Sequence, residues 1–523
     1  MTEIRDITDS PAAMDDARRA FAAGDISAAE IICKRVISST PENAEVWALL
    51  TETALQRGRS NAAMVCASRA VALRPQDPTN HILHAKCLFF SGAIAEACAA
   101  AETALSRLPA SKPRPADLDA LGAVFGLLGQ HTRAETFAQK AVAAEPNIPQ
   151  HLFNLAATER MIGALGLAEA HCDAAIALQP NYCLAHYLRV DLRTQTRERN
   201  HIADMEAVIR SGALSPSDEV LMHFALGKEY EDVEEHVRAF DHVEAACALH
   251  RNSSHYDPLR EIAEIDHIIQ TQTRDWLDSL PTATTAAAPI FVVGLPRTGT
   301  TLVERIVGSH SFVMSAGETG TFSNELRRAL QSADGKHFAL LGRRYLDSIA
   351  AFGVPRERHF IDKTLQNYLF CGFIHAVFPR AKIILARRHP LDAGWAMYKA
   401  HFRGQFSFSY DLTELADYLL AFCRLAAHWK TTLPAHAFIE IAYEDIVREQ
   451  TNASRRLIEF VDLPWQDGVL RFHESKAPST TASAVQIRRP VYATSVGKWR
   501  HHVERLEPLR VRLATQVPWT ELA

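Results

Sequence analysis

A regular spacing of glycines and prolines dominates the N-terminal half of this 523-residue chain. Successive glycines of the series are 34, 34, 37 and 34 residues apart, prolines keep the same spacing, and an alanine lies five residues after each glycine. The positions are Gly24, Gly58, Gly92, Gly129 and Gly163; Ala29, Ala63, Ala97, Ala134 and Ala168; Pro41, Pro75, Pro109, Pro146 and Pro180. Such a period predicts a stack of similar units, each packing on its neighbours.

Two amphipathic helices explain one unit: glycine permits the turn between them, proline stops the second, and alanine lets them cross closely. A generic alanine-rich bundle is the alternative, but it does not require phased markers. The pattern resembles the tetratricopeptide repeat over about residues 12–195. This resemblance implies a right-handed superhelix with a concave face that often binds peptides.

The sequence changes character after residue 280. Residues 281–289, PTATTAAAP, are typical of a linker. Short apolar runs at 290–293, 359–362, 382–386 and 437–442 then alternate with helix-length segments, which predicts a mainly parallel sheet covered by helices on both faces. We therefore expect an all-α array over 1–195, a helical cap or irregular repeats over 196–280, the linker, and an α/β domain over 290–523.

The segment GLPRTGTT, residues 294–301, follows the first predicted strand and begins a helix. Free N–H groups at a helix start bind phosphate groups, and Gly299 permits close approach of the backbone. In the nucleoside-triphosphate pattern GxxxxGK[ST], lysine would stand at Thr300, whereas the cation here is Arg297. The loop therefore predicts an anion site that differs from that of a kinase or ATPase.

The sequence PRTGTT resembles the 5′-phosphosulfate loop of sulfotransferases, close to the PRSGTT form of tyrosylprotein sulfotransferases and of bacterial proteins that join tetratricopeptide repeats to a sulfotransferase domain. The resemblance implies a P-loop-like sulfotransferase domain without a metal. Its donor would be 3′-phosphoadenosine 5′-phosphosulfate and its product 3′-phosphoadenosine 5′-phosphate. The implied 5′ site comprises Pro296, Arg297, Thr298, Gly299, Thr300 and Thr301.

The segment RRHPLDAGWA, residues 387–396, supplies a second anion signal at the end of a strand. Arg388, Pro390 and Asp392 resemble the family's RxPxD motif, which implies that Arg388 binds the 3′-phosphate. The family's serine position is Ala396, so one hydrogen bond worth about 1–2 kcal/mol is missing. Three further residues resemble donor-holding positions of the family: Tyr443, Ser495 and Lys498.

Two residues are candidates for the chemistry. Glu318 in MSAGET lies in a loop after the first helix of the domain, where a carboxylate can deprotonate an acceptor hydroxyl. Lys363 follows a strand, and with Arg297 it can stabilise the transition state electrostatically. The resemblance places the base and the transition-state lysine at these positions. His310 in GSHS is a weaker candidate for the base and is expected to be structural.

The charge and hydropathy of the chain limit the classes of partner that it is expected to bind. The formal net charge of -5 gives no reason to expect nucleic acid or a membrane surface. The polar N-terminus lacks the apolar centre of a signal peptide, and no stretch approaches the ~20 apolar residues that span a bilayer. These features predict a cytoplasmic protein.

Three functions remain open from the sequence. The first is a sulfotransferase acting on an acceptor hydroxyl, such as a protein tyrosine presented by the repeat array. The second keeps the enzyme but transfers to a carbohydrate or small molecule. The third is a repeat adaptor with a non-catalytic nucleotide-binding domain, which the missing serine at Ala396 would suit. The array itself can bind a peptide or protein acceptor, form a homodimer, or support the fold.

Overall fold

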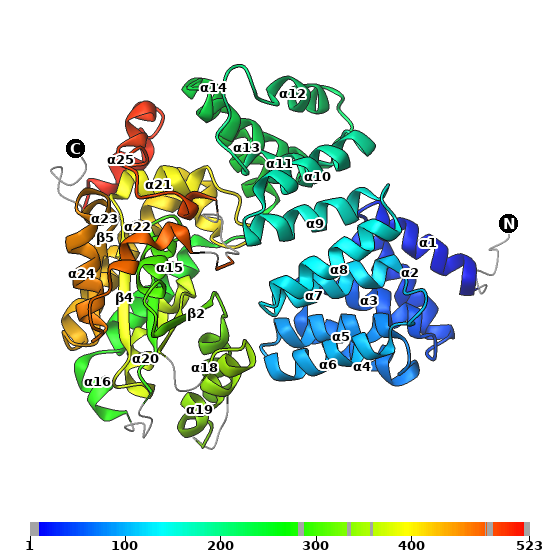
Figure 1. The fold of residues 1–523 in the computed structure, drawn as a ribbon, viewed down its shortest axis with the longest axis horizontal. Helices are drawn as coiled ribbons and strands as arrows, with labels where there is room; N and C mark the ends of the chain where they lie inside the picture. The colour runs from blue at the N-terminus through cyan, green and yellow to red at the C-terminus, as the bar shows by residue number, and fades with distance from the viewer. Residues whose placement is uncertain are drawn as a thin grey trace. The chain divides into compact units, whose positions relative to one another are not determined.

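The structure is a computed structural model that describes residues 10–280, 287–331, 336–355, 359–475, 477–478 and 485–516. The chain divides into two compact units, Met1–Pro146 and Asn147–Ala523. Figure 1 colours the chain from blue at the N-terminus to red at the C-terminus. Of the predicted linker 281–289, residues 281–286 lie outside the described part, and 287–289 belong to no helix or strand.

The first unit consists of helices packed in consecutive pairs, drawn in blue and cyan in Figure 1. The glycines of the repeat that lie between paired helices have left-handed backbones, with φ from 66° to 81°. The alanines that follow them are at most 2% exposed, so the helices cross where the side chain is small. The helices are α1 (Ser10–Ala22), α2 (Ile26–Ser39), α3 (Ala44–Gln56), α4 (Ser60–Leu73), α5 (Pro78–Phe90), α6 (Ile94–Arg107), α7 (Pro115–Leu127) and α8 (His131–Ala144). The predicted helical repeat array is confirmed.

The second unit begins with another hairpin of the same kind, because Gly163 has φ 93° and Ala168 is buried. The boundary between the compact units at residues 146 and 147 thus lies within the span predicted for the array. Further helices follow before the sheet, and α13, α14 and α15 share one hydrophobic core with the sheet. The helices are α9 (Pro149–Ile162), α10 (Leu165–Leu178), α11 (Cys183–Val190), α12 (Ile202–Arg210), α13 (Pro216–Asp232), α14 (His236–Ser253), α15 (Pro258–Thr271) and α16 (Arg274–Ser279).

A parallel sheet of five strands, in the order β2-β3-β1-β4-β5, forms the centre of the α/β region. The strands are β1 (Ile290–Val293), β2 (Val313–Gly317), β3 (His359–Asp362), β4 (Lys382–Arg387) and β5 (Phe438–Ala442). The expectation of a mainly parallel sheet is confirmed, and four strands were predicted within one residue at each end. The edge strand β2 was not predicted, since only Val313 of its five residues is buried.

Helices cover both faces of the sheet. Phe291 and Val293 of β1 face one hydrophobic cluster, whereas Ile290 and Val292 face another, as the alternation along a strand requires. The helices are α17 (Thr300–Gly308), α18 (Thr321–Leu330), α19 (Lys336–Ala351), α20 (Cys371–Val377), α21 (Pro390–Tyr398), α22 (Leu412–Thr432), α23 (Tyr443–Arg448), α24 (Gln450–Phe460) and α25 (Glu507–Leu513). Short 3₁₀ helices are η1 (Leu365–Phe370), η2 (Ser407–Tyr410), η3 (Asp467–Glu474), η4 (Gln486–Arg488) and η5 (Lys498–His502). None of the described helices has the length and apolarity needed to cross a bilayer.

Candidate functional site

The loop of residues 294–299, here called the phosphate loop, joins β1 to the N-terminus of α17. Arg297 and Gly299 have left-handed backbones with φ 66° and 98°. Gly294 has φ 149°, and a Cβ there would lie 2.5 Å from the carbonyl oxygen of Ala386, so only glycine fits. The hydroxyl of Thr298 donates a 2.7 Å hydrogen bond to the carbonyl of Leu295 within the loop. The loop is therefore tightly folded in front of a helix start whose first N–H groups can bind an anion.

The other predicted residues of the loop differ in exposure. Pro296, Thr300 and Thr301 are buried, whereas the side chain of Arg297 is half-buried and donates a 3.2 Å hydrogen bond to Gln486 Oε1. Arg297 is thus the cation of the loop, whereas Thr300 and Thr301 pack against the interior of the domain.

Arg388 lies beside the phosphate loop, directly after β4. Its Nη1 donates to the carbonyl of Arg297 at 3.2 Å, and its Nη2 donates to the carbonyl of Ser495. The guanidinium carbon stands 5.0 Å from the centre of the Tyr443 ring. Burial lowers the pKa of Arg388, with the charge of Asp392 opposing the shift. Its buried Nε has no hydrogen-bond partner among the described residues. This N–H group can therefore donate to an acceptor on a ligand, such as a phosphate oxygen.

Further hydrogen bonds fix the C-terminal segment to this site. Tyr443 Oη and Ser495 Oγ lie 2.6 Å apart. The carboxylate of Asp392, in the first turn of α21, accepts hydrogen bonds from the N–H groups of Gly497 at 2.6 Å and Trp499 at 3.2 Å. Asp392 matches the family motif in the sequence. That it holds the segment carrying Ser495 could be seen only in the structure, because the contacts join residues more than one hundred positions apart.

Glu318 and Lys363 form a second group at the same edge of the sheet. Glu318 follows β2 directly, so its position depends on the strand that the sequence did not reveal. Lys363 follows β3, its side chain is 1% exposed, and its ammonium group donates a hydrogen bond to Glu318 Oε1. Glu304 Oε2 lies 3.9 Å from the same ammonium group. The predicted base and the predicted cation are therefore in direct contact.

A buried carboxylate orders the loop behind this pair. Asp362 accepts hydrogen bonds from Tyr345 Oη at 3.0 Å, Thr319 Oγ1 at 3.2 Å and the N–H of Thr364 at 2.9 Å. Burial raises the pKa of Asp362, while these hydrogen bonds oppose the shift. Asp362 thus joins the segments after β2 and β3 that carry Glu318 and Lys363. The hydrogen bond network could not be inferred from the sequence, because its members are spread over more than forty residues.

The strand order places the two groups beside each other, since β3 and β4 both pair with β1. The N–H of Gly294 in the phosphate loop also donates to the carbonyl of Leu365, two residues after Lys363, at 3.4 Å. Lys498, which the resemblance gives as a donor-holding residue, has its ammonium group 3.9 Å from Glu231 Oε1 of α13. His310, the weaker candidate for the base, is buried with its Nε2 2.9 Å from the carbonyl of Pro464, a structural contact.

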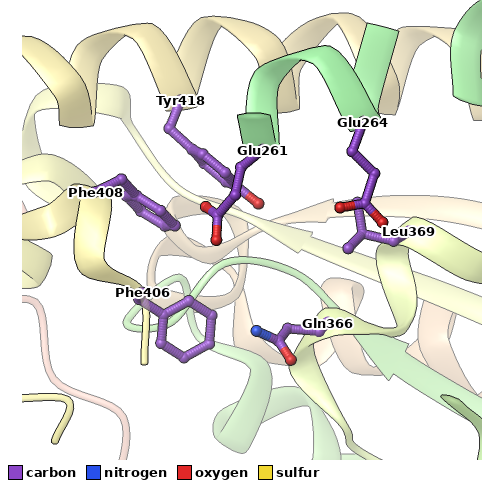
Figure 2. Close-up of a pocket in the computed structure, with 7 residues that line it drawn as sticks. All are labelled: Glu261, Glu264, Gln366, Leu369, Phe406, Phe408 and Tyr418. Carbon is purple, nitrogen blue, oxygen red and sulfur yellow. The ribbon is translucent and has the colours of Figure 1, made fainter. Parts of the chain in front are cut away.

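A pocket adjoins the loop after Lys363. It has a cavity volume of about 50 Å³, and it is lined by Glu261, Glu264, Gln366, Leu369, Phe406, Phe408 and Tyr418. Figure 2 shows the carboxylates of Glu261 and Glu264 directed toward the space between the aromatic rings and Gln366. The rings of Phe408 and Tyr418 stack with centroids 3.7 Å apart. These two rings therefore cover each other's faces, and the pocket is too small to hold a further ring.

Comparison with known proteins identifies the two regions. Residues 289–467 match the family model described as "Sulfotransferase family", and residues 20–87 match the model described as "Tetratricopeptide repeat". A protein of Aquifex aeolicus (strain VF5), itself described as uncharacterized, is 28% identical over 390 residues, covering 70% of this chain and 51% of the relative. Protein-tyrosine sulfotransferase 1 of Danio rerio is 26% identical over 234 residues, covering 40% of this chain and 65% of the relative.

Among solved structures, the sulfotransferase domain of the Synechococcus PCC 7002 olefin synthase is 15% identical, covering 43% of this chain and 97% of that domain, with a TM-score of 0.31. The chain spans less than two thirds of the length of the curated relatives it matches. The chain thus joins N-terminal tetratricopeptide repeats to a sulfotransferase-family domain and is distantly similar to protein-tyrosine sulfotransferases.

Proposed function

We propose that this chain transfers a sulfuryl group from 3′-phosphoadenosine 5′-phosphosulfate to an acceptor hydroxyl. The observation that carries the proposal is the position of the Glu318–Lys363 pair at the sheet edge where the phosphate loop and Arg388 lie. A base, a buried cation and two anion-binding elements are the parts that this reaction requires.

The donor would be held by residues of the phosphate loop and the C-terminal segment. The N–H groups at the start of α17 and the side chain of Arg297 would bind the 5′-phosphosulfate. Arg388, whose Nε has no hydrogen-bond partner in the described part of the chain, would bind the 3′-phosphate. Tyr443 and Ser495 would close this side of the site through their 2.6 Å contact.

The donor supplies an activated sulfuryl group whose S–O bond to phosphate breaks as the new S–O bond forms. Glu318 takes the proton of the attacking hydroxyl, and its exposed side chain leaves it accessible to an acceptor. Lys363 leaves Glu318 to stabilise the negative charge that collects on the oxygen of the departing phosphate. Arg297 shares this role. Burial of Lys363 excludes water from around its ammonium group, which strengthens this electrostatic stabilisation.

Two classes of acceptor are compatible with the proposed reaction. Distant similarity to protein-tyrosine sulfotransferases supports a tyrosine of a peptide or protein, which the repeat array would present. The sulfotransferase-family match does not specify the acceptor, so a carbohydrate or small molecule is the alternative.

Nucleotide binding to the full chain tests the donor assignment. Calorimetric titration with 3′-phosphoadenosine 5′-phosphate should give a defined affinity that falls at least tenfold in Arg388→Met, since a charge-assisted hydrogen bond contributes about 1.5–3 kcal/mol. Arg448→Met is a matched control, because Arg448 is exposed and lies 3.9 Å from Asp445. Tighter binding of ATP with magnesium would instead support a nucleoside-triphosphate enzyme.

A further inference from the structure

A carboxylate from the helical region pairs with two lysines, one of them on the C-terminal segment of the proposed donor site. Glu231, near the C-terminal end of α13, is 11% exposed and accepts hydrogen bonds from Lys399 with both of its oxygens. Trp395 Nε1 of α21 donates a third hydrogen bond at 3.2 Å, and Lys498 Nζ lies 3.9 Å from Oε1. One carboxylate thus faces two ammonium groups, one of which, Lys498, stands on the C-terminal segment that also carries Ser495.

Charge dominates this cluster. Burial acts to raise the pKa of Glu231, but the charges of Lys399 and Lys498 lower it, so the carboxylate is ionised at neutral pH. Burial lowers the pKa of Lys399 to about 8, Glu231 opposes the shift, and the positive charges of Lys498 and Arg297 add to it. Arg388 links this cluster to the phosphate loop, because its guanidinium donates to the carbonyls of Arg297 and Ser495, and Lys498 lies three residues after Ser495. These side chains form one cationic region with Glu231 as its internal anion.

We infer that Lys399 and Lys498 form an anion subsite next to the phosphate loop and that Glu231 occupies it until a phosphate group displaces it. This inference rests on the proposed use of a phosphorylated donor. A phosphate group carries more charge than a carboxylate and has more acceptor oxygens, so it would be the stronger partner for two ammonium groups. The ligand class is therefore a phosphate-type oxyanion.

Displacement has a cost, because Glu231 would lose its hydrogen bonds in a buried position. Glu231 thus lowers the affinity for the phosphate group and makes it depend on how α13 packs. The coupling is reciprocal: a bound phosphate weakens the attachment of the end of α13. Lys399 is the C-cap of α21, the helix that carries Ala396.

A purely structural ion pair makes the opposite prediction. If Glu231 only anchors α13 to α21, its loss should destabilise the protein without improving anion binding. Glu231→Gln keeps the shape of the side chain and removes its charge. Asp266→Asn is a matched control, because it removes one carboxylate of an ion pair that joins α15 to Arg424 of α22 at 2.7 Å.

Calorimetry on the full chain would measure the affinity for 3′-phosphoadenosine 5′-phosphate, adenosine 5′-phosphate and inorganic phosphate. We expect Glu231→Gln to bind the first nucleotide about tenfold tighter than the natural chain, Asp266→Asn to be unchanged, and Glu231→Gln/Lys399→Gln to lose the gain. A gain for the first nucleotide alone assigns the subsite to the 3′-phosphate, and an equal gain for both nucleotides assigns it to the 5′ group.

The inference is overturned by one result. Glu231→Gln binds none of the three anions more tightly than the natural chain, and its unfolding midpoint is no lower than that of Asp266→Asn. If Glu231→Gln unfolds more readily than Asp266→Asn, the single variant Lys399→Gln is the test. The subsite requires Lys399→Gln to bind inorganic phosphate more weakly than the natural chain, and equal binding overturns the inference. If neither nucleotide binds the natural chain but inorganic phosphate binds Glu231→Gln more tightly, the subsite stands and the donor assignment fails.

Discussion

Replacing Asp392 by alanine should release the C-terminal segment from the donor site. Asp392 is 2% exposed, and its two oxygens accept hydrogen bonds from the N–H groups of Gly497 and Trp499. These contacts fix the start of η5, and the same segment carries Ser495 and Lys498. Without the carboxylate, the segment keeps the contact of Ser495 with Tyr443 but loses its two hydrogen bonds to Asp392 of α21.

The size of the effect follows from the two hydrogen bonds. Each bond to a charged group contributes about 1.5–3 kcal/mol, and the released N–H groups regain hydrogen bonds to water when the segment opens. We therefore expect a local opening equilibrium about 3 kcal/mol more favourable in Asp392→Ala, which is roughly a 150-fold change. Asp392→Asn keeps one carbonyl oxygen as an acceptor, so its effect should be about half as large in free energy.

Amide hydrogen exchange of the segment around residues 495–500 measures this opening directly. Asp392→Ala should exchange roughly a hundredfold faster there, and its affinity for 3′-phosphoadenosine 5′-phosphate should fall. Asp445→Ala is the control, because Asp445 is half-exposed and stands 3.9 Å from Arg448. Unchanged exchange in Asp392→Ala would refute the reasoning that these two hydrogen bonds hold the segment.

Three further predictions concern the loop, the ring beside Arg388 and a buried histidine. Gly299→Ala places a Cβ 2.9 Å from Tyr443 Cδ2 at φ 98°, so chemical denaturation should report a loss of about 1–3 kcal/mol, and an unchanged unfolding free energy would contradict the strain. Tyr443→Phe removes the 2.6 Å hydrogen bond with Ser495 and keeps the ring, so the affinity for 3′-phosphoadenosine 5′-phosphate should fall about fivefold, about 1 kcal/mol, and an equal affinity would show that the contact is dispensable. Burial lowers the pKa of His502 to about 4, so below pH 6.5 only the unfolded chain takes up the proton and stability falls as the pH drops toward 4. His502→Phe should remove about 2 kcal/mol of the stability lost between pH 7 and pH 5, measured by denaturation at both values, and an identical acid profile would exclude His502 as its source.

Patterns with a local physical cause were predictable from the sequence. The left-handed turns of the repeat need glycine at each position, and the central strands are short apolar runs because both of their faces are buried. The edge strand β2 escaped detection because Ser315, Ala316 and Gly317 carry no apolar pattern. Its pairing with β3 places Glu318 directly after a strand.

The candidate site was predictable only where one short segment carries its chemistry. The phosphate loop and Arg388 follow strands and could be recognised from that context. The contact of Lys363 with Glu318 joins two segments 45 residues apart, and the bond between Lys399 and Glu231 joins segments 168 residues apart. Such pairs depend on the tertiary fold, and no local pattern marks Glu231 in α13.

Sulfuryl transfer by the full chain tests the central claim most directly. Incubation of labelled 3′-phosphoadenosine 5′-phosphosulfate with cellular extract, followed by mass spectrometry, would identify a labelled polypeptide, glycan or small molecule. We predict one labelled acceptor with release of an equal amount of 3′-phosphoadenosine 5′-phosphate, and a loss of about 10²–10⁴-fold in rate for Glu318→Gln. Transfer at an undiminished rate in Glu318→Gln, or no transfer by the natural chain to any class of acceptor, would contradict the account.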